Sequence, residues 1–244
     1  MNGRPRYNVE ISPVRDIILR GSADLSFWAE RLEREDLVPL GDGGKAQLLL
    51  IAVDAKFMGV RFRELSVAVS LEASGGTDGH DAVYLPQAFN SVRLFAFVER
   101  TFYHTPYYPA RIRVETRLPA AFEVSLAEGV ILRAEMSADS TSATRKPTRL
   151  QEESWEGPIF LPSSPRQQDP KVFFARLAGH THAYPFAARD TITLKPTSRA
   201  PIVEWLAESE FSPQEWAIRE TATHARTKSV GRSSVPLSPA GQAG

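Results

Sequence analysis

The sequence predicts an α+β fold that is mainly β: an antiparallel β-barrel or double sheet with a few flanking helices. Short apolar or alternating segments recur along the chain, and glycine- and proline-containing turns separate them. Helical periodicity is confined to isolated stretches. No internal repeat of roughly 20 to 50 residues is visible, which argues against solenoids and propellers. With 244 residues, the chain has the length of one large domain.

One amphipathic helix is expected near the start of this domain. Ser22 or Asp24 can cap it, and it ends before Pro39. Four apolar residues share one face: Leu25, Trp28, Ala29 and Leu32. Strands are then expected at 47–53, 58–72, 82–85, 92–100, 110–118, 122–126 and 130–136.

The second half of the chain looks less regular. Residues 137–169 are rich in Ser, Thr, Pro and Arg, which predicts a long excursion that could act as a lid. Strand character resumes at 171–177 and 191–194, and a short helix is expected at 201–208.

A final helix is expected from Ser212 to about Arg226, because Ser-Pro-Gln-Glu is a capping box with proline at the first helical position. Beyond it the chain has little to bury. We therefore expect an N-terminal leader at 1–20, a single domain at 21–227 and a disordered tail at 228–244.

Composition restricts the function. The 29 basic and 29 acidic residues balance, so no overall field favours nucleic acid or an anionic membrane. The absence of cysteine excludes disulfides, thiolate metal sites and a cysteine nucleophile. No apolar run has the length of a secretion signal or a membrane span. We expect a cytoplasmic protein whose partner is a small molecule.

The densest group of chemically active side chains lies at 97–109, beside a proline-marked turn. It would follow one strand and precede another, so its polar groups should gather where a sheet enters a turn. The candidate site residues there are Glu99, Arg100, Tyr103, His104, Tyr107 and Tyr108.

Three motifs carry a resemblance. The expected helix leads into Leu-Val-Pro-Leu at 37–40, and Phe-Met-Gly-Val-Arg-Phe-Arg-Glu at 57–64 precedes an apolar strand. Glu99-Arg100 is followed by Thr-Pro-Tyr-Tyr-Pro-Ala at 105–110. In order and spacing they resemble the Val-Pro-x-x-Leu, Gly-x-Tyr-x-Glu and Arg-Glu-x-x-Gly-Phe-Pro-Lys-Lys-x-Ala motifs of the acetoacetate decarboxylase-like superfamily.

The resemblance implies the barrel or double sheet of that superfamily, a lyase-type activity of the decarboxylase or dehydratase kind, a role in secondary metabolism, and a homo-oligomer as one assembly to consider. In the family, a lysine after Phe-Pro forms a Schiff base. Tyr107 and Tyr108 stand at the two lysine positions, and tyrosine cannot form an imine. Glu64 is unchanged in type. The order of Glu99 and Arg100 is exchanged, which leaves open which of them faces the pocket.

The surviving groups suit acid–base chemistry without a cofactor. Arg100 could hold a substrate carboxylate as a bidentate fork, with Glu99 and Tyr103 beside it. Tyr107 or Tyr108 could donate a hydrogen bond to a developing enolate.

Glu64 or His104 would then transfer the proton. This chemistry fits decarboxylation, dehydration or tautomerisation of a small keto acid or a polyketide-like metabolite. The alternative is a noncatalytic member of the same fold that binds a small molecule or a partner. That protein would have a dry, aromatic or filled cavity in which Glu64 and Arg100 neutralise each other. If the residues at 97–109 have no functional role, the tyrosines pack a strand end and Arg100 pairs with Glu99 or Glu115.

The remaining histidines suggest little. His180 and His182 have the spacing of metal ligands on one face of a strand, but no third ligand follows, so we expect no metal site. His224 is expected to be solvated or to help dock the last helix.

Overall fold

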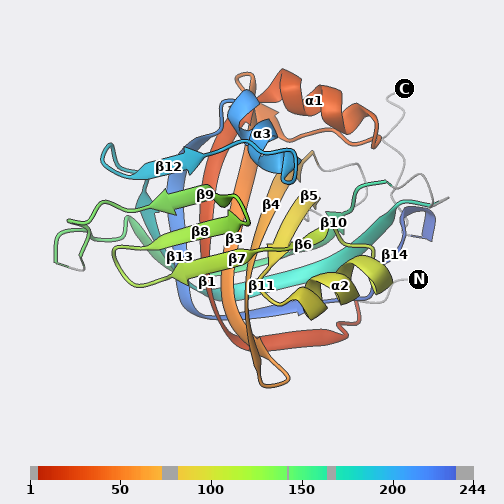
Figure 1. Cartoon of the computed structure of the whole chain (residues 1–244), viewed down its shortest axis with the longest axis horizontal. Coiled ribbons are helices and arrows are strands. Elements are labelled where there is room, and N and C mark those ends of the chain that lie inside the picture. The colour runs from red at the N-terminus through yellow and green to blue at the C-terminus, as the bar shows by residue number, and fades with distance from the viewer. Residues whose placement is uncertain (1–4, 73–81, 142, 164–168, 235–244) are drawn as a thin grey trace, which may run out of the picture.

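The computed structural model describes residues 5–72, 82–141, 143–163 and 169–234, and most of them form strands (Figure 1). Ten strands form a large sheet. They are β1 (Val9–Asp24), β2 (Gly41–Asp42), β3 (Lys45–Phe57), β4 (Val60–Leu71), β5 (Ala82–Asn90), β6 (Tyr107–Pro109), β10 (Arg149–Phe160), β11 (Lys171–Pro185), β13 (Ser212–Arg226) and β14 (Val230–Gly231). The second sheet contains β7 (Arg111–Glu115), β8 (Ala121–Leu126), β9 (Gly129–Glu135) and β12 (Thr191–Leu194).

The large sheet closes on itself. Strand β1 pairs with β13 along one edge and with β3 along the other, so the order β1-β13-β11-β10-β5-β4-β3 returns to β1. Neighbours in this ring are antiparallel except β10 and β5, which share a short parallel contact. The predicted fold class is confirmed.

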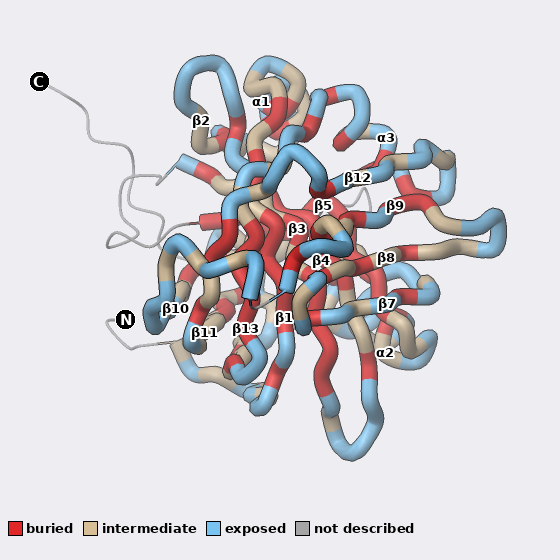
Figure 2. Tube along the Cα trace, turned by 90° about the vertical axis from the view of Figure 1, so that its left-hand side faces the viewer, coloured by how far each residue is buried: buried red, intermediate tan, exposed pale blue. Residues whose placement is uncertain are grey.

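Parts of the ring, such as the middle of β1 and most of β3, are buried on both faces. Ile17 and Leu19 of β1 pack under the second sheet, whereas Ile18 faces the interior of the ring. The same alternation separates Leu50 of β3 from Leu49. Figure 2 shows this buried layer running through the middle of the molecule. An apolar run such as Ile-Ile-Leu therefore serves two different environments.

Two helices lie where the sequence predicts them. Asp24 caps α1 (Leu25–Glu33) by accepting a hydrogen bond from the amide of Phe27 at 2.7 Å. The bounds of α3 (Pro201–Glu208) match the prediction. Trp28 and Trp205 meet edge to face with ring centroids 6.3 Å apart, so the two helices pack against each other at one end of the ring (Figure 1). Within the described residues, no helix has both the length and the apolarity needed to cross a membrane.

Two predicted elements have the wrong type. Residues 92–100, expected as a strand, fall in α2 (Arg93–Phe102), whose inward residues Phe95, Val98 and Glu99 follow helical spacing. Residues 212–226, expected as a helix, form β13, because pairing with β1 and β11 on both sides outweighs the local capping signal.

Three predicted boundaries are also wrong. Most of the expected leader at 1–20 belongs to β1, and the expected excursion at 137–169 contains β10, which is a member of the ring. The expected tail at 228–244 contains β14 and the 3-10 helix η1 (Arg232–Ser234), and its residues 235–244 lie outside the described part. The polar composition of these segments does not indicate strands, because the outward-facing residues of the strands are solvated.

Asp190, in the turn before β12, ties the second sheet to the ring. Its buried carboxylate accepts hydrogen bonds from Arg145 at 2.8 and 2.7 Å and from the indole of Trp216 at 3.0 Å. Trp216 in turn packs against Phe122 of β8 and Phe186. One carboxylate thus satisfies donors from β13 and from the loop before β10.

We expect Asp190→Ala to lower the free energy of unfolding by about 3 kcal/mol, because it leaves Arg145 and Trp216 without their buried acceptor. Asp139→Ala removes an exposed ion pair with Arg189 at 3.0 Å and should cost less than about 1 kcal/mol. Urea unfolding of both variants checks the difference. Equal losses would contradict the role given to Asp190.

Candidate functional site

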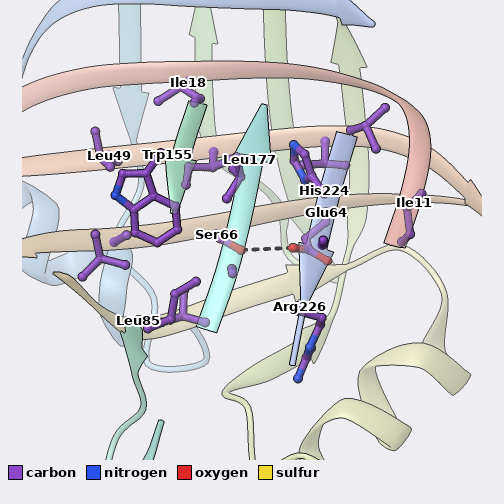
Figure 3. A pocket seen from close by; sticks show the side chains of 18 of the residues that line it. Ile11, Ile18, Leu49, Glu64, Ser66, Leu85, Trp155, Leu177, His224 and Arg226 are labelled. Atoms are coloured by element: carbon purple, nitrogen blue, oxygen red, sulfur yellow. Dashed lines mark hydrogen bonds between the residues drawn. The ribbon is translucent and has the colours of Figure 1, made fainter. Parts of the chain in front are cut away.

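A cavity of about 900 Å³ occupies the interior of the ring. Alternate residues of β3 and β11 line it, together with residues of β1, β4, β5, β10 and β13, and α2 borders it. Most of these side chains are apolar, and Figure 3 shows Ile18, Leu49, Leu85, Trp155 and Leu177 around it. A volume of this size is near the upper end of the range typical of small-molecule sites.

Glu64 is the centre of a small hydrogen-bonded group on the cavity wall. The hydroxyl of Tyr107 on β6 donates to Oε1 of Glu64 on β4 at 2.5 Å. The hydroxyl of Ser66, two residues further along β4, donates to the same oxygen at 3.2 Å (Figure 3). Strand alternation places Glu64 and Ser66 on one face, and the parallel pairing of β5 with β6 brings Tyr107 to them.

The environment of this group favours its protonated forms. Burial raises the pKa of Glu64 to about 7, against the hydrogen bond from Tyr107, which lowers it, and with a further contribution from the negative charge of Glu99. Burial, followed by the nearby Glu64, also raises the pKa of Tyr107 well above its ordinary value. Near neutral pH, Glu64 can therefore both donate and accept a proton.

His224 on β13 is a second proton-transfer candidate in the cavity wall. Its Nε2 lies 2.7 Å from Oδ2 of Asp16, whose carboxylate also accepts two hydrogen bonds from Arg219 at 2.8 and 2.7 Å. Burial opposes ionisation of Asp16, but the bonds from His224 and Arg219 outweigh it and lower its pKa. The ionised Asp16 fixes the ring of His224 and leaves Nδ1 as the nitrogen available to a ligand.

The cavity also contains a paired acid and base near Tyr103. Nη1 of Arg226 donates to both oxygens of Glu99 at 2.9 and 2.7 Å, and Thr105 donates to Glu99 at 2.8 Å. The guanidinium of Arg226 lies 4.9 Å from the ring centroid of Tyr103 and 4.5 Å from that of Phe173. These contacts hold α2 against β11 and β13.

The other arginines of the cavity wall are paired in the same way. Arg20 donates to Glu153 at 2.8 Å and to Glu215 at 2.5 Å, and Arg219 is held by Asp16. Every arginine that lines the cavity within the described residues therefore has a carboxylate partner.

The structure brings part of the predicted site together. Glu64, Tyr107, Glu99 and Tyr103 line the cavity, so Glu99 rather than Arg100 faces it.

Arg100, His104 and Tyr108 are exposed and lie outside the cavity lining, contrary to their expected place in the site. Arg100 points outward because successive residues of an α-helix point about 100° apart, and its neighbour Glu99 faces the cavity. Arg100 instead lies 5.6 Å from the ring centroid of Tyr108. Tyr108 follows Tyr107 on β6, where strand alternation turns it outward.

The sequence analysis missed Asp16, His224 and Arg226. The sequence predicts a leader around Asp16 and a helix at His224 and Arg226, so neither region was expected to line a site. The signal that could have found the last two is their spacing of two residues, which puts both side chains on one face of a strand.

The lysines and the paired histidines lie elsewhere. All lysines of the chain fall in the described part, and none lines the cavity. His180 and His182 lie on β11. Among the described residues, no group of three or more histidine and carboxylate side chains is placed to hold a metal ion.

We expect Glu64→Gln to change how stability depends on pH. The folded pKa of about 7 exceeds the ordinary 4.5, so this group's contribution is complete below pH 4.5 and is lost as pH rises through 7. The free energy of unfolding should fall by about 3 kcal/mol over this pH range, and Glu64→Gln should remove this pH dependence. Urea unfolding between about pH 5 and about pH 8 measures this pH dependence of the free energy of unfolding. Glu30→Gln, on the exposed face of α1, is the control. Parallel pH curves for wild type and Glu64→Gln would contradict the raised pKa.

Comparison with known proteins identifies the fold of this chain through solved structures, and not through its sequence. No protein-family model matches the sequence, and no curated protein sequence matches it. Among solved structures, the enduracididine biosynthesis enzyme MppR in complex with pyruvate is similar with a TM-score of 0.59 at 12% identity, over 95% of this chain and 91% of MppR.

Acetoacetate decarboxylase from Legionella pneumophila has a TM-score of 0.58 at 13% identity, over 95% of this chain and 92% of the enzyme. An acetoacetate decarboxylase-like enzyme from Sphingomonas wittichii has a TM-score of 0.57 at 11% identity, over 90% of each chain. This chain therefore has the acetoacetate decarboxylase-like fold.

Proposed function

We propose that the protein is a lyase-type enzyme that acts on a carbonyl compound by general acid–base chemistry, without a Schiff base. The observation that carries this proposal is Glu64. A carboxyl group with a pKa raised to about 7 meets Tyr107 at 2.5 Å on the wall of a large cavity. Perturbed acids in clefts are typical of functional sites.

Formation of an enol is the step that these residues suit. A carbonyl oxygen bound beside Glu64 would accept a hydrogen bond from the protonated carboxyl group of Glu64, which Tyr107 holds in place by a hydrogen bond from its own hydroxyl to Oε1. His224, oriented by Asp16, would take the proton from the neighbouring carbon. The electron pair of the C–H bond then forms the C=C bond, and the carbonyl oxygen takes the proton of Glu64. Tautomerisation, dehydration and decarboxylation share this enol or enolate.

Two facts support a route without an imine. None of the lysines lines the cavity, and Tyr107 contacts Glu64 at one of the two positions where the family motif has lysine. Arg226, the arginine whose charge acts on Glu64, is already bound to Glu99. MppR, whose fold is similar, has been solved with a condensation product of pyruvate and imidazole 4-carboxaldehyde, which suggests a carbonyl ligand for this cavity as well.

The second candidate is a noncatalytic binding protein of the same fold. It is favoured by the mainly apolar wall and by the pairing of each cavity-lining arginine in the described residues. Binding alone needs no acid with a pKa near neutrality, which is why we place the enzyme first.

Hydrogen–deuterium exchange of carbonyl compounds tests the enzyme without knowledge of the net reaction. We expect the protein in D₂O to exchange the α-hydrogens of at least one of acetophenone, benzylacetone, acetoacetate and pyruvate, followed by proton NMR. Glu64→Gln should reduce the rate at least about a hundredfold, which is the usual contribution of a general acid. His224→Ala should also slow exchange, and Glu30→Gln should not. Prior treatment with borohydride should leave the rate unchanged.

Loss of activity only after borohydride treatment in the presence of substrate would show a Schiff base and refute the mechanism. Binding without exchange by wild type would favour the noncatalytic candidate.

A further inference from the structure

The cavity wall indicates what kind of molecule fits. We propose that its ligand is an uncharged, mainly apolar carbonyl compound much larger than pyruvate, such as an aryl ketone or a long-chain alkyl ketone. The inference rests on the proposed function in one respect only, that the carbonyl group lies at Glu64 and Tyr107.

Size is the first argument. A cavity of about 900 Å³ would remain mostly filled with water around a ligand as small as pyruvate. Its wall consists mainly of side chains such as Leu49, Leu85, Trp155, Phe173 and Leu177, which offer no hydrogen bonds to that water apart from the indole of Trp155. An apolar ligand of matching size would displace the water and gain its transfer free energy.

Charge is the second argument. A carboxylate ligand needs an available cation, and the arginines that line the described part of the cavity are each held by an acid of the protein. The charge of Arg226, for example, is matched by Glu99, which accepts both hydrogen bonds from its Nη1, although its buried Nη2 has no hydrogen-bond partner in the described part of the chain. Releasing such an arginine would leave a buried carboxylate without its partner. The negative charge of Glu99, which acts on the neighbouring Glu64, would also repel an anion.

Hydrogen-bonding capacity is the third argument. Several places on the described part of the wall can serve a neutral oxygen. They include the group of Glu64, Tyr107 and Ser66 and the ring of His224. Nη2 of Arg226 is a further buried donor without a hydrogen-bond partner among the described residues. The group of Glu64, Tyr107 and Ser66 carries no formal charge when Glu64 is protonated. An apolar body with one or two oxygens therefore matches the wall.

The entrance is apolar as well. Leu94 of α2 lines the cavity and is 64% exposed, so α2 borders an opening. Phe97 and Phe102 of the same helix are 50% and 68% exposed. An apolar ligand meets favourable contacts before it enters.

Binding of two matched series tests the proposal. Unbranched methyl ketones and the corresponding unbranched keto acids, of equal chain length, would displace the uncharged dye Nile red from the wild-type protein. We expect the Kd of the ketones to tighten about fourfold for each added methylene until the cavity is full. Each keto acid should bind at least about tenfold more weakly than its ketone. Keto acids that bind more tightly, or ketone affinities that do not change with chain length, would overturn the proposal.

A cavity-filling variant locates the binding. Ala68 lines the cavity, so Ala68→Phe should raise the Kd of the longest ketone by a factor of at least about ten. Ala207→Phe, at an exposed position of α3, is the matched control and should bind as wild type does. Equal affinities of the two variants would place the ligand elsewhere and overturn the proposal. If Ala68→Phe does not fold, the two series on wild type still decide it.

Glu64→Gln separates this inference from the proposed function. It should slow exchange at least about a hundredfold, whereas ketone binding is measured on the wild-type protein, which keeps its acid. Ketones that bind to wild type as expected but never exchange would refute the enzyme and leave the ligand class standing. Exchange of small keto acids alone would refute the ligand class and leave the enzyme standing.

Discussion

The closure of the sheet by β1 is the constraint on which the rest of the structure depends. Because β1 pairs with both β3 and β13, the seven strands enclose a space instead of forming an open layer. Asp16 and Arg219 stand opposite each other in the register of β1 and β13 and form two buried hydrogen bonds across it. The same carboxylate orients His224, so closure of the ring and one wall of the site share an interaction.

The second sheet and the helices allow the ring to keep a large cavity. Strands such as β1 and β3 place one set of side chains under β8 and β9 and the other set around the cavity. Most of the tightly packed core therefore lies outside the ring. Burial of Glu64 opposes stability at neutral pH, since its carboxyl group must either hold a proton or ionise away from water. Acids are kept in such surroundings mainly where they serve chemistry.

The acetoacetate decarboxylase-like fold fixes the position of this site but not its chemistry. Tyr107 points inward and Tyr108 outward because they are neighbours on one short strand. Of the two, only Tyr107 therefore lines the cavity, and its hydroxyl meets the carboxyl group of Glu64. The neighbouring enzymes at 10–13% identity share the scaffold, whereas the donors and acceptors of this cavity come from this chain's own residues.

The sequence by itself determined the fold class, α1 and α3, most strands up to 136, and the candidates Glu64, Glu99, Tyr103 and Tyr107, because alternation, caps and turn residues act locally. Tertiary structure decided the rest. The capping box at 212–215 does not start a helix, because pairing on both sides of β13 stabilises a strand there. The polar stretch at 149–160 forms β10, a strand of the ring. His224 joined the site only because Asp16, 208 residues away in sequence, lies beside it across β1 and β13. Such contacts depend on strand register, which no local pattern records.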